Sequence, residues 1–308
     1  MSPSNLKAFS RYTDSISFIY IEHAVIERED QSVAAFTDQG RIDLPAANLG
    51  TLLLGPGTRI THGALNVLSS CGCVLAWVGE EGLKHYAVGQ AKTRSSASIE
   101  KQCRMWADDT LRGVVVRRMY ELRFGEAISP QLTLNQIRGK EGARVRDAYR
   151  DAATAFGVQW SGRAYKQDTW DAADPVNKAL SAANAALYAV VLAGLHSLGF
   201  SPALGFIHTG KQLSFVYDVS DLYKMEVTVP AAFEAAVDRS AGVERRARRL
   251  FRERAHGARL LDRLGADLAR LFGDVRDEPP LLEGDAPGDL WSPSGPVRGG
   301  VLYGDSGD

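Results

Sequence analysis

Residues 174–198 have the sequence DPVNKALSAANAALYAVVLAGLHSL, and this stretch decides the fold class of the second part of the chain. Asp174 followed by Pro175 is a helix-start signal, because aspartate caps free amides and proline is favoured at the first helical position. From Val176 to Leu198 the residues are mostly Ala, Leu and Val. A helix that is apolar nearly all round is buried. We therefore expect a central helix around which other elements pack.

Helical spacing of apolar residues extends to both sides of this stretch. Further helical segments are predicted at Ser95–Phe124, Leu132–Phe156, Asp218–Met225, Pro230–Arg239 and Val243–Phe272. The last of these is rich in arginine and predicts one long helix or a helix pair. Residues 91–276 are therefore expected to form an all-helical domain.

The first 90 residues have a different pattern. Ser15–Ile26 alternates between apolar and polar residues and is rich in Ile, Phe and Tyr, which is typical of a strand. One short helix, His62–Ser70 with Thr61 as its N-cap, is expected to interrupt the strands. The other predicted strands, most of them bounded by turn residues, are 33–37, 49–54, 73–78 and 83–88. The predicted fold class is α+β, with a small N-terminal β-sheet domain (residues 1–90) before the larger helical domain.

The composition is that of an ordinary globular protein. The 308 residues are enough for two packed domains, and 45% of them are apolar. The N-terminus lacks the apolar core of a signal peptide, and no apolar run approaches the roughly 20 residues of a membrane span. We expect a cytoplasmic protein. Residues 277–308 contain seven acidic residues and one arginine, so the remainder is mildly basic, and this Pro/Gly-rich tail is expected to be flexible.

The three cysteines, Cys71, Cys73 and Cys103, are too few for a disulfide framework. A structural zinc site usually takes four ligands in paired spacings, and no second Cys/His pair is placed to complete one. We expect all three to be buried, small apolar residues.

Glu141 lies where an apolar residue belongs. It is four residues from both Ile137 and Val145 and so shares the inward face of its predicted helix. A lone charge on that face is costly unless it is paired or bound to a metal. An ion pair with Arg138 or Arg144 and a functional role have equal weight from this helix alone.

A second segment, Gly205–Leu222, has the sequence GFIHTGKQLSFVYDVSDL. Two apolar, strand-like pieces flank a predicted turn, with His208 at its edge. Asp218 and Asp221 then lie at i and i+3 near a predicted helix start, which puts both carboxylates on one face. A capping aspartate or a hydrogen-bonded core histidine would each be ordinary. One His and two Asp within 14 residues, with an inward Glu elsewhere, are less easily explained that way.

Carboxylates with one imidazole suit Mg²⁺ or Mn²⁺ better than zinc. Such an ion polarises a phosphodiester and lowers the pKa of a bound hydroxyl. Basic residues near these acids that could hold phosphates are Arg138, Lys140, Arg144, Arg146, Lys211 and Lys224. The residues alone therefore indicate metal-dependent phosphoryl transfer on a nucleic acid.

Two further basic segments have an ordinary and a functional interpretation. The arginine run at 245–254 contains Glu244 and Glu253, and a solvated, salt-bridged helix face is the usual explanation. If the protein handles DNA, the same run suits the DNA backbone. The second segment, residues 160–170, contains both aromatic and basic residues. Core packing of the aromatic rings is the default interpretation, and stacking on a base is the alternative. The residues are Trp160, Arg163, Tyr165, Lys166 and Trp170.

Together these residues resemble a known family. The segments that carry the resemblance are Leu54–Arg59, Leu122–Glu126, Arg138–Gly142 and Gly205–Asp221, and similarity runs from about residue 14 to residue 275. They are similar to the CRISPR-associated integrase-endonuclease of the adaptation complex, specifically its type I-E branch. The resemblance implies a homodimer, with two dimers flanking a small ferredoxin-like second adaptation protein. It also implies capture of a DNA duplex with frayed 3′ ends, which is then inserted at CRISPR leader-repeat DNA.

The same resemblance implies roles for individual residues. The metal ligands would be Glu141, His208 and Asp221, with Asp218 completing the catalytic set. Lys211 and Tyr217 would surround the pocket that recognises the motif flanking the captured strand. Other implied DNA-binding residues are Arg59, Lys84, Arg138, Arg146, Arg163, Lys224, Arg245 and Arg248. Relatives stack a tyrosine on the duplex end, and His23 occupies that place here.

The expected function is thus spacer acquisition in antiviral defence by a metal-dependent DNA endonuclease and integrase that uses Mg²⁺ or Mn²⁺. The alternative is a stand-alone metal-dependent nuclease on branched DNA or RNA, with water as the nucleophile. The sequence does not separate the two, because the nucleophile is not a protein residue. A third hypothesis is a non-catalytic DNA-binding scaffold. The intact set of Glu141, His208, Asp218 and Asp221 argues against it.

Overall fold

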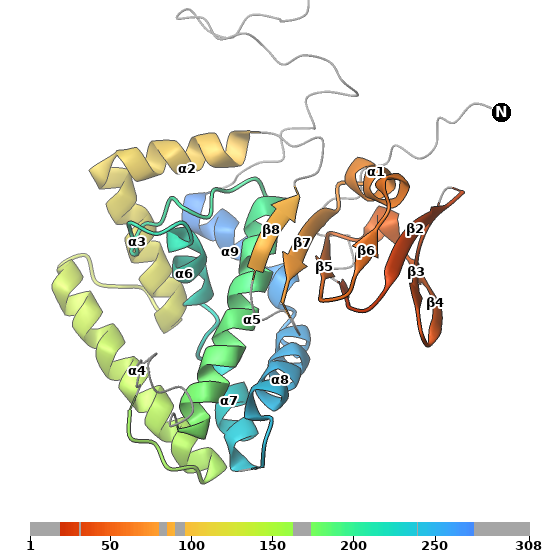
Figure 1. Cartoon of the computed structure of the whole chain (residues 1–308). Coiled ribbons are helices and arrows are strands. Elements are labelled where there is room, and N and C mark those ends of the chain that lie inside the picture. Colours follow the sequence, from red (N-terminus) through yellow and green to blue (C-terminus); the bar gives the residue numbers. More distant parts are fainter. Residues whose placement is uncertain are drawn as a thin grey trace, which may run out of the picture. The chain divides into compact units, whose positions relative to one another are not determined.

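The structure, a computed structural model, describes residues 19–30, 32–79, 85–89, 96–162, 174–238 and 240–273. Within them the strands come first and end at Gly89, and the larger, helical part begins at Ala97 (Figure 1). The predicted α+β fold class is therefore confirmed. The described residues belong to one compact unit that extends to Asp274. The predicted tail at 277–308 lies outside the described residues, as do Lys84 and Arg163.

The described strands form two four-stranded sheets. In the first sheet the order is β1 (Ile19–Ile21), β5 (Thr51–Leu54), β7 (Val74–Val78) and β8 (His85–Gly89). In the second sheet the order is β4 (Gly40–Leu44), β3 (Ser32–Thr37), β2 (Val25–Glu29) and β6 (Arg59–Ile60). The short strands β4 and β6 were not expected from the sequence. Helix α1 spans His62–Ser70 and is capped by Thr61, as predicted, and it packs on the second sheet.

The strand predicted at Ser15–Ile26 is broken in the described residues. β1 ends at Ile21, and β2 begins at Val25 in the other sheet. Between them His23 has a φ of 51°, in the left-handed region that non-glycine residues seldom adopt. Its amide donates to the carbonyl of Pro56 at 2.9 Å. The alternating pattern continues on both sides of this turn, so the pattern alone does not reveal it.

Eight described helices follow the strands. They are α2 (Ala97–Ala107), α3 (Asp109–Phe124), α4 (Leu134–Phe156), α5 (Pro175–Ser197), α6 (Ser214–Ser220), α7 (Thr228–Val237), α8 (Val243–Gly257) and α9 (Leu260–Phe272). The segment predicted at Ser95–Phe124 is two helices, because Asp108 is extended and its side chain accepts from the Leu111 amide at 2.9 Å. The segment at Val243–Phe272 is a helix pair, which was one of the two predicted alternatives.

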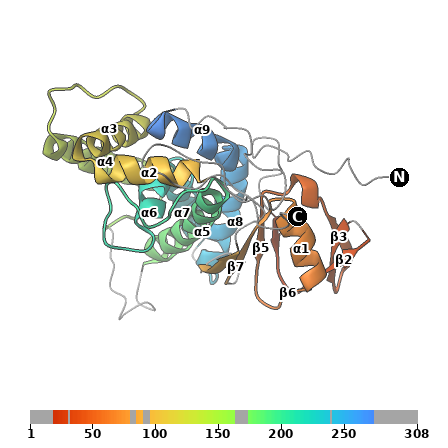
Figure 2. The same ribbon diagram turned by 90° about the horizontal axis from the view of Figure 1, so that it is seen from above.

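Helix α5 is the predicted central helix. It contacts α6 to α9 and the strands β5 and β7 (Figures 1 and 2). By length and composition it is apolar enough to cross a membrane, so the expectation that no apolar run reaches that length was wrong. However, 78% of its most apolar window is buried within the fold, which is typical of a core helix.

The prediction that all three cysteines are buried is correct only in part. All three cysteines are free thiols, and Cys73 is buried among apolar residues of the β part. Cys71 is partly buried, whereas Cys103 is exposed on α2. Cys103 therefore does not have the buried position that was predicted for it.

Candidate active site

Asp218 is the buried anchor of the site, with a side chain that is 0% exposed. Its Oδ2 accepts from the amides of Phe206 and Ile207, at 2.5 and 3.0 Å. Its Oδ1 accepts from the His208 amide at 2.8 Å and lies 2.7 Å from His208 Nδ1. Both oxygens are therefore used to fold the loop at 206–208 around one carboxylate.

The local structure here differs from the predicted strand, turn and strand. Residues 205–213 form bends and turns, and α6 begins at Ser214, four residues before the predicted helix start. Asp218 thus lies within α6, and Asp221 follows directly after its end. Gly205 is required by close packing, since a Cβ there would lie 2.2 Å from the carbonyl oxygen of His208. The apolar residues that suggested two strands lie instead in a loop and a short helix.

The ring of His208 is oriented by its bond to Asp218. With Nδ1 engaged, Nε2 is the ring nitrogen that remains for a ligand, as in carboxylate–histidine–metal arrangements. The ring makes a T-shaped contact with Tyr217, with centroids 6.0 Å apart, and Tyr217 in turn contacts Tyr188 of α5. The ring is part-exposed and reachable from solvent.

The loop that carries His208 is also held from α2 and α3. Gln102 is buried, donates to the carbonyls of Ser201 and Leu204, and accepts from the Ser201 amide. Trp106 Nε1 donates to the Gly205 carbonyl at 3.0 Å. Arg112 donates to the same carbonyl and to that of Phe206, at 3.2–3.3 Å. These contacts join residues about 100 positions apart, so no local sequence pattern indicates them.

Asp221 is bound by two cations. Its Oδ1 lies 2.6 Å from Lys224 Nζ, and its Oδ2 lies 3.0 Å from Arg123 Nη2. Burial alone would raise the pKa of this carboxyl, but Lys224 and Arg123 outweigh burial and hold the pKa below its usual value. For Lys224, burial alone would lower the pKa, but Asp221 and the Tyr188 hydroxyl outweigh it, and the pKa of the ammonium is raised. Both groups are therefore charged at neutral pH.

Glu141 lies on α4 and is 16% exposed. The inward face expected on this helix is only partly buried: Ile137 is buried, whereas Val145 is partly covered. The ion pair with Arg144, one of the two predicted alternatives, is present, and Arg123 adds a second one. Glu141 Oε1 is 3.6 Å from Arg123 on α3, and Arg144 is more distant, at 3.9 Å from Oε2.

Arg123 therefore joins carboxylates from two segments, and the helical pattern did not single it out. Its side chain is 4% exposed, lies in the last turn of α3, and pairs with both Glu141 and Asp221. One signal in the sequence could have indicated Arg123. It is an arginine that lies between Leu122 and Phe124 on a helix that packs in the core.

The donor types at this site fit a divalent cation. Glu141 Oε2 is buried and has no hydrogen-bond partner, and Asp221 and His208 Nε2 add a carboxylate and an imidazole. As the side chains stand, however, no three His, Cys, Asp or Glu groups among the described residues are close enough to hold an ion. Arg123 is paired with both carboxylates instead.

The other predicted DNA-binding residues lie in different places. Lys211 is exposed on the loop after His208, and Arg138 and Arg146 are exposed on α4. Arg59 is exposed on β6, and Arg245 on α8. Arg248 is 8% exposed, so its side chain lies within the fold. The structure thus brings Lys224, Tyr217 and Lys211 to the site segment and places Arg138 and Arg146 on the helix that carries Glu141. The others lie on separate elements.

His23 is exposed at the turn between the two sheets. A Cβ at Gly57, which has a φ of 70°, would lie 2.5 Å from His23 Nδ1. Glycine at position 57 therefore lets the imidazole lie directly against the Gly55–Gly57 turn.

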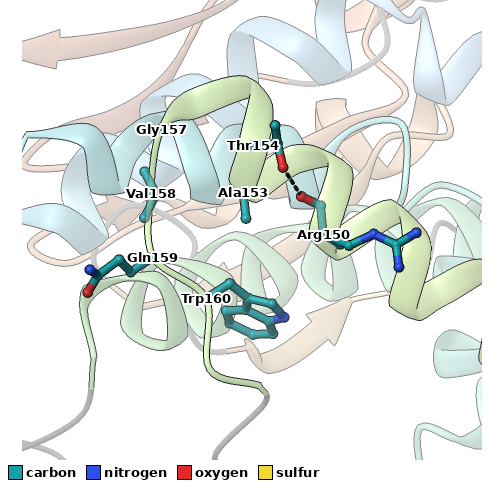
Figure 3. A pocket seen from close by; sticks show the side chains of 7 residues that line it. All are labelled: Arg150, Ala153, Thr154, Gly157, Val158, Gln159 and Trp160. Carbon is teal, nitrogen blue, oxygen red and sulfur yellow. Dashed lines mark hydrogen bonds between the residues drawn. The ribbon is translucent and has the colours of Figure 1, made fainter.

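An open hollow of about 380 Å³ lies at the end of α4 (Figure 3). It is lined by Arg150, Ala153, Thr154, Gly157, Val158, Gln159 and Trp160. Trp160 stacks on Tyr149 at 5.2 Å and meets Phe233 edge-on at 5.4 Å. Core packing, the default interpretation for Trp160, therefore describes it well. None of the predicted catalytic residues line this hollow.

The site residues fall within a region that matches a known family. The family described as CRISPR associated protein Cas1 matches residues 116–241, which include Glu141, His208, Asp218 and Asp221. A relative from Thermus thermophilus, named CRISPR-associated endonuclease Cas1 2, is 50% identical over 98% of this chain and 94% of its own. The chain belongs to the Cas1 family. The resemblance inferred from the sequence is confirmed at this level.

Two other comparisons agree with the Cas1 assignment. A CRISPR-associated endonuclease Cas1 from Clostridium sp. strain SY8519 is 40% identical over 95% of this chain and 97% of its own. A solved structure described as a TtCas1–DNA complex is 50% identical and has a TM-score of 0.74, covering 86% of this chain and 99% of that one. The Cas1 relatives are named endonucleases, and the fold is shared across nearly their full length.

Proposed function

We propose that this Cas1 protein is a metal-dependent DNA endonuclease and integrase of CRISPR spacer acquisition, of the type I-E branch. It would join a short prespacer duplex to the CRISPR repeat through attack by the 3′-hydroxyl of the duplex. The observation that carries the proposal is the Asp218-anchored His208 beside Asp221, which shares Arg123 with Glu141. These donors suit Mg²⁺ or Mn²⁺.

Glu141, His208 and Asp221 would hold the ion, which supplies polarisation of the phosphodiester and a lower pKa for the attacking hydroxyl. Asp218 fixes the tautomer of His208 by accepting from Nδ1, so that Nε2 points away from the buried carboxylate. Lys224, largely buried and charged, is placed to pair with a phosphate oxygen once Asp221 has another partner. Lys211 and Tyr217 would contact the captured strand beside the ion.

DNA binding is proposed because a similar Cas1 structure is described as a DNA complex. The contacts would come from the exposed arginines Arg59, Arg138, Arg146 and Arg245, and His23 would stack on the duplex end. Residues 1–90 would serve in dimerisation and DNA contact, and residues 91–276 in catalysis. Two dimers would flank a small ferredoxin-like second adaptation protein.

The test is a strand-transfer assay. The protein, its small partner, Mn²⁺ or Mg²⁺ and a labelled duplex with free 3′-hydroxyls are mixed with a supercoiled plasmid that carries a leader and repeat. Label should enter the plasmid and should not do so when the 3′ ends are blocked. Nicked plasmid or shortened duplex without label transfer would instead support a stand-alone nuclease with water as the nucleophile.

Substitutions separate catalysis from binding in the same assay. Glu141→Ala, His208→Ala and Asp221→Ala should each abolish joining and leave duplex binding largely intact. Glu226→Ala is the matched control, because Glu226 is exposed and pairs only with Arg263 in the described contacts. Unchanged joining by His208→Ala would support a non-catalytic scaffold.

A further inference from the structure

The two carboxylates proposed to bind the metal already share a cation that belongs to the protein. Arg123 Nη1 is 3.6 Å from Glu141 Oε1, and Nη2 is 3.0 Å from Asp221 Oδ2. The other oxygen of Asp221 is 2.6 Å from Lys224 Nζ. Both oxygens of one proposed ligand are therefore paired with cations before any ion is bound.

Arginine is suited to this position. Carboxylates brought together in a poorly solvated place repel each other unless a cation lies between them. The guanidinium keeps its charge at every pH of interest, and its planar fork reaches two acids at once. Arg123 is also held from its other side, over the Tyr120 ring at 5.3 Å, and by donation to the Asp218 carbonyl.

The charges at the site are nearly balanced. The carboxylates of Glu141 and Asp221 face the cations Arg123, Lys224 and Arg144. The Asp218 carboxylate is bonded to backbone amides and His208. Little net negative charge therefore remains among these groups to attract a divalent ion. An ion that entered between the carboxylates would also lie close to the guanidinium and be repelled by it.

A DNA phosphate changes this balance. It adds a negative charge beside the ion, and it offers Lys224 an anion to replace Asp221. An ion and a phosphodiester together are therefore accommodated much better than an ion alone. Thermodynamic reciprocity then requires that each one tighten the binding of the other by the same factor.

We propose that Arg123 is a resident counter-cation that holds Glu141 and Asp221 together without metal and keeps metal affinity low until a DNA phosphate enters. Arg123 is thus a positioning residue that links metal binding to DNA binding. The proposal rests on the proposed metal-dependent function and specifies how the same site is regulated.

The first test uses the wild-type chain. Free Mn²⁺ is titrated by electron paramagnetic resonance, without DNA and with a short duplex whose 3′ ends are blocked, so that no reaction occurs. Mn²⁺ bound by the duplex alone is measured separately and subtracted. The protein should bind Mn²⁺ at least roughly tenfold more tightly with the duplex. Equal affinity in the two titrations would overturn the proposal without any variant.

The second test removes the charge. Arg123→Met should bind Mn²⁺ without DNA roughly ten- to a hundredfold more tightly than the wild type, and the effect of DNA should shrink accordingly. Arg118→Met is the matched control, because Arg118 lies on the same helix and donates to the Leu271 carbonyl. A folded Arg123→Met chain that binds Mn²⁺ no better than the wild type would rule out the counter-cation role. If Arg123→Met does not fold, the wild-type titrations can still overturn the proposal.

Glu141→Ala separates failure of this proposal from failure of the proposed function. With duplex present, Glu141→Ala should lose the Mn²⁺ site. If Mn²⁺ binds as tightly to Glu141→Ala as to the wild type, the metal site itself is misassigned and the proposed function falls. If binding depends on Glu141 but not on DNA, only the role of Arg123 is lost.

Discussion

Helix α5 and the segment at 201–227 pack against each other through α6, but they are held in place in different ways. α5 is fixed by apolar side chains that are buried on nearly every side, so its position follows from its own sequence. The segment at 201–227 contains one short helix and otherwise turns, and polar contacts from other elements fix it. The core is therefore encoded locally, whereas the site depends on hydrogen bonds between distant residues.

The largest expected effect lies in the polar segment. Asp218→Ala leaves three amides of the loop at 206–208 without their acceptor. Each unsatisfied buried group costs about 1–3 kcal/mol, so we expect the free energy of unfolding to fall by about 4 kcal/mol or more. Urea unfolding measures this. A loss below about 1 kcal/mol would mean that the loop does not depend on Asp218.

A substitution in the core of α5 should lower the stability of the fold but should have no specific effect on the active site. Leu180 is fully buried, and Leu180→Ala should lower the free energy of unfolding by about 3 kcal/mol. Strand transfer per folded molecule, measured well below the melting temperature, should remain that of the wild type. A selective loss of joining would contradict the contrast between the two regions, since it would show that core packing tunes the site.

Gln102 tests the same contrast from α2. It is buried and makes three hydrogen bonds to the loop that precedes His208. Gln102→Ala should cost about 2 kcal/mol of stability. Joining should fall by more than the unfolded fraction explains, because His208 loses its support. Arg104→Ala, at an exposed position of the same helix, is the control. Equal joining by the two variants would show that Asp218 alone positions His208.

These differences explain what the sequence could predict. The helix with Thr61 as its N-cap and the central helix both have the predicted start, because capping and apolar spacing are local signals. The break at His23 was missed, since the alternating pattern continues through it. Glu141 was singled out by its position on a helix, and its local partner Arg144 was one of two alternatives. Its partner Arg123 was not predicted, because Arg123 and Glu141 meet only in the folded chain.

The smallest expected effect is a difference between two arginines of α8 in how they change the salt dependence of DNA binding. The family resemblance implies a DNA-binding role for both. Arg245 is exposed, whereas Arg248 is 8% exposed. Neutralising a phosphate contact lowers the salt dependence of DNA affinity by about one unit of slope. Arg245→Ala should therefore flatten the plot of log affinity against log salt, with little change in melting temperature. Arg248→Ala should mainly lower the melting temperature, since its stem packs within the fold. If Arg248→Ala flattens the slope and Arg245→Ala does not, α8 must change its exposed face when DNA binds.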